Sequence, residues 1–201
     1  MRASHLQNRG PMLEIRIHGR GGQGVVTAAE LLSSAAFREG QYAQAFPSFG
    51  SERMGAPVTS FCRLDARPIR LREPIDRPDV VVVQDPTLLA SHDVFAGLGP
   101  DGWLLVNSSR GFAELGLAEW VTRFRPERVC CVAATDLARE HLGRPLPNAA
   151  LLGGLAGLTG AVAIESLAAA IRERFPGAVG ERNAAAAAAA YHLTHAPEAA
   201  C

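Results

Sequence analysis

The sequence predicts an α/β protein with a single doubly wound, mostly parallel sheet, similar to a Rossmann fold, and a helical C-terminal portion. Two observations support this prediction. As far as Thr135, short apolar segments alternate with helix-like segments, as expected for parallel strands joined by crossover helices. Beyond Thr135, three helix-like segments follow one another with no strand between them.

The first unit is an apolar strand that runs into a cluster of glycines, and the cluster opens into an amphipathic helix reaching Glu39. Gly19, Gly21 and Gly24 have the spacing G-x-G-x-x-G, and Gly22 is an extra glycine. Glycines allow a tight turn and bring backbone N–H groups close to a ligand, while the N-terminus of the next helix attracts anions. This strand–turn–helix unit predicts a binding site for a diphosphate group. The alternative is that the turn binds no ligand and serves only to pack the strand against the helix.

Further strands are expected at residues 41–46, 58–64, 79–85, 103–106 and 129–133, with an edge-hairpin strand at 69–71. Helices are expected at residues 86–96, 115–124, 148–160, 164–175 and 181–195. The unbroken run of four valines within residues 79–85 (DVVVVQD) is typical of a parallel strand buried on both faces. Asn148 and Asn183 are expected to cap their helices, and Asp85 to cap the helix after its strand. The alanine-rich last helix suits close packing, either within this chain or against another subunit.

Composition excludes several classes of protein. The chain of 201 residues balances 20 Lys plus Arg against 20 Asp plus Glu, so it has no basic field to attract nucleic acid or a membrane surface. No apolar run approaches the roughly 18 residues that a membrane span needs, and the expected location is the cytoplasm. Residues 1–11 are expected to be a flexible leader, and residues 12–201 one domain.

Missing residues exclude specific kinds of site. The chain has no lysine, which rules out a P-loop and Schiff-base chemistry. Its four cysteines lack the paired spacing of a zinc or iron–sulfur site, so no metal site is expected. An NAD-binding fold usually has an acidic residue at the end of its second strand, whereas the expected second strand ends in Gln44, Ala45 and Phe46. NAD is therefore a poor fit, and no residue qualifies as a chemical catalyst.

The order of several motifs resembles the gamma subunit, or gamma domain, of thiamine-diphosphate-dependent 2-oxoacid:ferredoxin (acceptor) oxidoreductases. The motifs are IRIHGRGGQGVVTAAELL, FPSFGSERMGAPVTSFCRL, RPDVVVVQDPTLL, RPLPNAALLGGLAGLTG and the tripeptide Glu181-Arg182-Asn183. The resemblance spans Met12 to Tyr191, and the form of residues 52–57 (ERMGAP) is closer to the pyruvate-type branch than to the 2-oxoglutarate branch.

The resemblance implies that this chain binds coenzyme A (CoA) and helps to assemble a complex. Alpha, beta and delta subunits would decarboxylate the 2-oxoacid with thiamine diphosphate and Mg²⁺ and pass electrons through [4Fe–4S] clusters. The beta subunit would hold thiamine diphosphate, and the delta subunit would be ferredoxin-like. The acceptor would be ferredoxin, or NAD through a flavin subunit. The substrate stays open among pyruvate, branched-chain acids and aromatic acids such as phenylglyoxylate or indolepyruvate.

The residues expected to bind CoA are Gly19, Arg20, Gly21, Gly22, Gln23, Gly24, Val25 and Thr27 in the glycine turn, and Ser51, Arg53, Met54, Gly55 and Ala56 in the following loop. Arg20 and Arg53 are candidate phosphate ligands, because a guanidinium matches phosphate oxygens in pairs. The alternatives are an exposed loop arginine for Arg20, and for Arg53 a salt bridge to Glu52 or a subunit contact. Two other functions remain open, a purely structural bridging subunit and a stand-alone NAD-binding protein.

Overall fold

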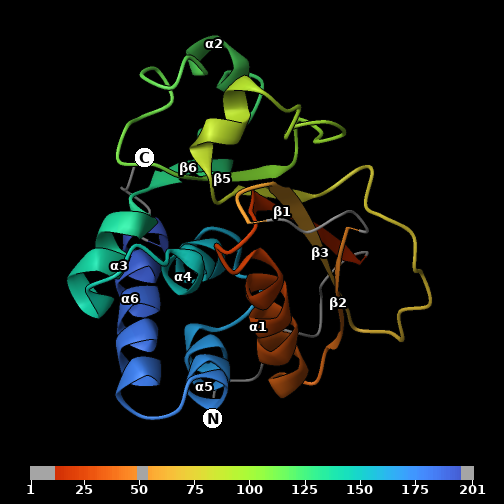
Figure 1. The fold of residues 1–201 in the computed structure, drawn as a ribbon. Coiled ribbons are helices and arrows are strands. Elements are labelled where there is room, and N and C mark those ends of the chain that lie inside the picture. The colour runs from red at the N-terminus through yellow and green to blue at the C-terminus, as the bar shows by residue number, and fades with distance from the viewer. Residues whose placement is uncertain (1–11, 49–53, 196–201) are drawn as a thin grey trace.

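A computed structural model describes residues 12–48 and 54–195. One six-stranded sheet runs through the molecule (Figure 1). Its strands are β1 (Leu13–Arg20), β2 (Tyr42–Pro47), β3 (Pro57–Asp65), β4 (Val80–Val83), β5 (Trp103–Asn107) and β6 (Val129–Val132). They lie in the order β2-β3-β1-β4-β5-β6. The pairs β1–β4, β4–β5 and β5–β6 are parallel, whereas β3 is antiparallel to both of its neighbours.

The two faces of the sheet are covered differently (Figure 1). One face carries the long helices, and the other carries short helical turns and loops. The long helices are α1 (Val25–Arg38), α4 (Asn148–Thr159), α5 (Ile164–Arg174) and α6 (Ala178–His195), joined by α3 (Ala134–Leu142). The short turns are η2 (Pro86–Ala90), α2 (Ala118–Val121) and η3 (Pro126–Arg128). The expected α/β class is therefore confirmed, and the sheet is mixed, with three of its five strand pairs parallel.

Strand β4 shows how the sequence builds both layers. All four of its valines are buried, as expected for a strand covered on both faces. Val80 and Val82 belong to the core under the long helices, whereas Val81 and Val83 belong to the core under the short turns. This alternation follows from the two-residue period of side chains along a strand.

Three expected elements are wrong in type or extent. Residues 69–71 form no strand, because β3 already has β1 and β2 as its two neighbours and leaves no free edge for a hairpin partner. The expected helix 86–96 is only the short turn η2, and the expected helix 115–124 is only α2. Polar residues interrupt the first of these segments, where Ser91 Oγ lies 2.8 Å from His92 Nδ1 in a local contact that competes with helix formation.

The C-terminal helices lie close to their expected positions, but the predicted caps are wrong. Pro147, not Asn148, is the N-cap of α4, and Asn183 lies inside α6, which begins five residues earlier at Ala178. Helix α3 was not expected. The alanine-rich face of α6 packs on α4 within this chain, where a Cβ added to Gly153 would collide with the carbonyl oxygen of Ala187.

Candidate functional site

The glycine turn lies at the carboxyl end of β1 and leads into α1. Gly22 and Gly24 have φ angles of 89° and 73°, which only glycine adopts readily. Gly24 is the N-cap of α1, and no side chain caps the helix. Among the described residues, the N–H groups of residues 25–27 have no hydrogen-bond partner. The turn therefore presents free donors at the positive end of a 14-residue helix.

A side-chain network holds the turn in place. Gln23 donates from Nε2 to Asp85 Oδ2 (2.7 Å) and accepts at Oε1 from the backbone N–H of Arg20 (2.8 Å). Asp85 also accepts from Thr87 through its backbone N–H (2.9 Å) and its hydroxyl (2.6 Å), as expected for the N-cap of η2. Arg20 closes the network, with Nε 3.3 Å from Asp85 Oδ2 and Nη2 donating to Thr87 Oγ1 (2.9 Å).

The electrostatic state of Asp85 follows from these contacts. Burial alone would raise the pKa of the Asp85 carboxyl, but the hydrogen bonds from Thr87 and Gln23 and the charge of Arg20 outweigh burial and hold the pKa below its ordinary value. Asp85 is thus a carboxylate at neutral pH and has both a capping role, as expected, and a role in fixing the glycine turn.

The second loop contacts the glycine turn through backbone hydrogen bonds. Gly21 donates to the carbonyl oxygen of Ala56 (2.8 Å), and Gly55 donates back to Gly21 (3.1 Å). Met54 covers Gly22, because a Cβ at Gly22 would lie 2.5 Å from Met54 Sδ. The structure thus brings these parts of the two predicted segments together. Ser51 and Arg53 lie outside the described residues.

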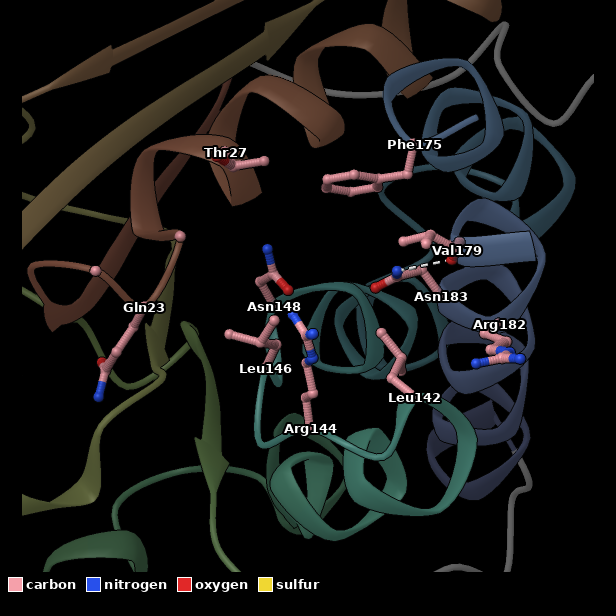
Figure 2. A pocket seen from close by; sticks show the side chains of 12 residues that line it. Gln23, Thr27, Leu142, Arg144, Leu146, Asn148, Phe175, Val179, Arg182 and Asn183 are labelled. Atoms are coloured by element: carbon pink, nitrogen blue, oxygen red, sulfur yellow. Dashed lines mark hydrogen bonds between the residues drawn. The ribbon is translucent and has the colours of Figure 1, made fainter. Parts of the chain in front are cut away.

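A cavity of about 480 Å³ opens between the glycine turn and the helical layer (Figure 2). It is lined by Gly22, Gln23, Gly24, Thr27, Leu142, Arg144, Leu146, Asn148, Phe175, Val179, Arg182 and Asn183. Four of these residues were expected in the site. The others come from the stretch between the end of α3 and the start of α4, and from the stretch between the end of α5 and the first turns of α6. A second cavity of about 330 Å³ lies on the β3 side of the turn, between α1 and Val58.

Two buried asparagines face the larger cavity (Figure 2). Asn148 is 8% exposed as a residue, but its side-chain amide is open to the cavity and has no hydrogen-bond partner within residues 12–48 and 54–195. The amide lies so close to the turn that a Cβ at Gly24 would be 2.8 Å from Asn148 Nδ2. Asn183 is 4% exposed and donates from Nδ2 to Val179 O (2.9 Å), so its Oδ1 remains available as an acceptor.

The cavity also has two arginines that the sequence analysis did not single out. Arg144 and Arg182 are exposed, and neither side chain forms an ion pair or hydrogen bond with any residue the structure describes. Each stands within a motif quoted for the family resemblance, four residues before Asn148 and directly before Asn183. Their position in those motifs is the feature of the sequence from which these two arginines could have been predicted as site residues.

The described part of the chain offers little reactive chemistry. Burial raises the pKa of the Cys62 thiol to about 12 and that of the Cys131 thiol to about 11, so neither is a thiolate at neutral pH. Within that part, no three His, Cys, Asp or Glu side chains gather as a metal site would require. No helix there has both the length and the hydropathy needed to cross a bilayer.

Comparison with known proteins identifies the family. Residues 14–193 match the family model described as pyruvate ferredoxin/flavodoxin oxidoreductase. The chain is 52% identical over 183 residues to the "Pyruvate/ketoisovalerate oxidoreductases common subunit gamma" of Pyrococcus abyssi, covering 91% of this chain and 97% of that protein. It is 49% identical over 180 residues to the "Pyruvate synthase subunit PorC" of Methanothermobacter marburgensis, covering 90% and 96%.

Solved structures agree with this result. The pyruvate oxidoreductase subunit PORC of Thermotoga maritima superposes with a TM-score of 0.76 at 39% identity, covering 90% of this chain and 96% of that one. The 2-oxoglutarate:ferredoxin oxidoreductase of Magnetococcus marinus, solved with coenzyme A bound, shares the fold at 18% identity and a TM-score of 0.69, covering 93% of this chain and 31% of that one. The chain described here belongs to the pyruvate ferredoxin/flavodoxin oxidoreductase family, as a gamma subunit of the pyruvate type.

Proposed function

We propose that this gamma subunit binds CoA in the larger cavity and holds it for an acyl-transfer reaction in the other subunits of a 2-oxoacid oxidoreductase. The observation that carries the proposal is the Asn148 amide, which points into the cavity from a mostly buried residue and has no partner among the described residues. Because this amide is open to the cavity and unpaired within the described chain, both its NH₂ group and its oxygen can hydrogen-bond to a ligand held there.

The charges around the cavity favour a phosphorylated ligand. Helices α1 and α4 both begin at the cavity, and neither has an acidic residue in its first turn or a side-chain cap. Their N-termini meet where Gly24 approaches Asn148, so two positive helix ends point at one place. Arg144 and Arg182 add two guanidinium groups. Among phosphorylated ligands, CoA is the one that the family resemblance implies.

The sheet order argues against the alternative of a stand-alone NAD-binding protein. In a Rossmann fold the second strand adjoins the first, and its end holds the ribose of the dinucleotide. Here the antiparallel strand β3 separates β2 from β1, which moves the end of β2 away from the glycine turn. The crevice between β1 and β4 is occupied by Arg20, Gln23 and Asp85.

In this proposal the chain positions CoA, and the residues that make and break bonds lie in the other subunits. The 2-oxoacid would lose CO₂ and electrons in partner subunits that carry thiamine diphosphate, Mg²⁺ and [4Fe–4S] clusters, and the CoA thiol would collect the acyl group there. The partners would be the alpha, beta and delta subunits, with a flavin subunit where NAD is the acceptor. Holding the thiol at the acyl group makes the reaction effectively unimolecular.

The variant Asn148→Ala tests the proposal. Because the amide has no hydrogen bond within the described chain, its removal should leave the unfolding temperature of the ligand-free subunit unchanged within about 2 °C. It should raise the dissociation constant for CoA about 10-fold, as expected when a buried hydrogen bond to the ligand is lost. In the reconstituted complex, the KM for CoA should rise while release of CO₂ from the 2-oxoacid continues.

Two results would count against CoA binding here. One is a wild-type subunit and complex in which CoA produces no binding heat and no protection from proteolysis. The other is an Asn148→Ala complex with unchanged CoA dependence. Either result would favour the purely structural role, in which the chain only bridges the catalytic subunits.

A further inference from the structure

The glycine turn has a cavity on each side, and both cavities share its residues. Gly22, Gly24 and Thr27 line the 480 Å³ cavity on the helical side and also the 330 Å³ cavity on the β3 side. The free N–H groups of residues 25–27 lie where the two cavities meet. An elongated ligand can therefore cross the N-terminus of α1 with one end in each cavity.

The helical-side cavity has the chemistry of a nucleotide site. Phe175 is half-buried and directs its ring into the cavity, as a base-stacking side chain would (Figure 2). Asn148 and Asn183 supply amide groups that can hydrogen-bond to a base or a sugar. Arg144 and Arg182 supply the cavity's two guanidinium groups that have no partner among the described residues, and these suit a terminal phosphate.

The β3-side cavity has different chemistry. Its side-chain wall consists mainly of Val25, Val26 and Val58. Among the described residues its one charged side chain is that of Arg20, which already contacts Asp85, Thr87 and the carbonyl oxygen of Gly55. The described walls of this cavity therefore suit an uncharged, flexible arm.

Building on the proposed function, we infer the direction in which CoA lies. Its adenosine 3′-phosphate occupies the helical-side cavity, with Arg144 and Arg182 as specificity-determining residues for the 3′-phosphate. The diphosphate crosses the N-terminus of α1, and the pantetheine arm runs past Val26 and Val58. The thiol then leaves the chain beside the start of β3, so the subunit that presents the acyl group must dock on the β3 side and not over the helical layer.

The first test compares CoA with 3′-dephospho-CoA by calorimetric titration of the full-length subunit. Arg144→Ala and Arg182→Ala should each weaken CoA about 10-fold, the usual effect of losing a charge-assisted hydrogen bond, and leave 3′-dephospho-CoA within about 2-fold. Arg70→Ala is the matched control, because Arg70 is exposed but lines neither cavity. Equal weakening of both ligands by the two cavity variants would overturn the assignment of the 3′-phosphate.

The second test places the same bulky side chain in either cavity. Val179 lines the helical-side cavity and Val26 the β3-side cavity, and neither is fully buried. Val179→Trp should abolish binding of adenosine 3′,5′-bisphosphate, and Val26→Trp should leave the binding of that ligand unchanged. Both variants should weaken the binding of CoA. If Val26→Trp instead abolished binding of the bisphosphate and Val179→Trp did not, the inferred direction of CoA would be refuted, but CoA would still bind at the glycine turn. A wild-type subunit that binds neither ligand would refute the proposed function together with the direction.

Discussion

The carboxylate of Asp85 is expected to contribute measurable stability, because it connects β4 to the glycine turn. Asp85→Asn keeps one oxygen, which can still accept from the backbone and hydroxyl of Thr87. The introduced NH₂ group would then face the NH₂ group of Gln23 and the guanidinium of Arg20, all of them donors. Gln23 cannot flip without losing its hydrogen bond from the Arg20 backbone.

The expected magnitude follows from the contacts that are lost. One charge-assisted hydrogen bond contributes about 1.5–3 kcal/mol, and the partly exposed ion pair with Arg20 adds little. Asp85→Asn should therefore lower the free energy of unfolding by about 2 kcal/mol at pH 7. The matched control is Asp136→Asn, because the Asp136 side chain pairs only with Arg139 in the described part of the chain and both side chains are more than half exposed. The control should lose less than about 0.5 kcal/mol.

The stabilisation by Asp85 should depend on pH, and the direction of that dependence follows from the lowered pKa. The folded state holds the pKa of Asp85 below its ordinary value of about 3.9, so protonation favours the unfolded chain. The contribution of Asp85 is complete above roughly pH 5 and is lost as the pH falls toward the lowered pKa. Urea unfolding followed by tryptophan fluorescence should therefore show wild type and variant converging in acid. A difference below 0.5 kcal/mol at pH 7, on the order of a surface pair, or one that does not shrink in acid would refute this reasoning.

Three further outcomes are expected. Asn148→Asp should weaken CoA binding more than Asn148→Ala, because it adds a negative charge where a phosphate is proposed; tighter binding would contradict that placement. Gly153→Ala should destabilise the chain by about 1–3 kcal/mol in thermal unfolding through overpacking against Ala187, and an unchanged melting temperature would argue against the close helix contact. Burial, with the charge of Arg16 adding to it, lowers the pKa of His18 to about 3, so the NMR signals of its ring should not titrate between about pH 8 and 5. Since the unfolded chain takes up that proton below about pH 6.5, stability should fall as the pH drops further; a ring midpoint near 6 would contradict this.

The sequence predicts local features of this fold well, because they depend on neighbouring residues. The glycine turn, the buried run of β4 and the three C-terminal helices all follow from spacing and apolar pattern. The position of β3 between β1 and β2 depends on pairing across the chain, which is why the hairpin strand at residues 69–71 was wrong. Helix α3 was missed although its segment is amphipathic, because it is only nine residues long and begins two residues after β6.

The candidate site shows the same division. The turn and parts of the second loop were predicted as neighbours, and the structure brings Gly21 and Ala56 together. Asn148 and Asn183 were interpreted as helix caps, because a cap is the commonest role of asparagine near a helix start. Their shared place in the cavity depends on how α4 and α6 pack, and no single segment carries that information.

The contact at Gly153 has a consequence for how such a site can change over evolution. Contacts of Gly153 with Ala187, and of Gly157 with Tyr191 and Thr194, show that α4 and α6 run in the same direction at close range. The two asparagine amides stand at matching heights on these helices, about one turn before the contact. A larger residue at position 153 would push the helices apart and widen the opening between the amides. The size of the accepted ligand can thus be tuned by a residue that never touches it.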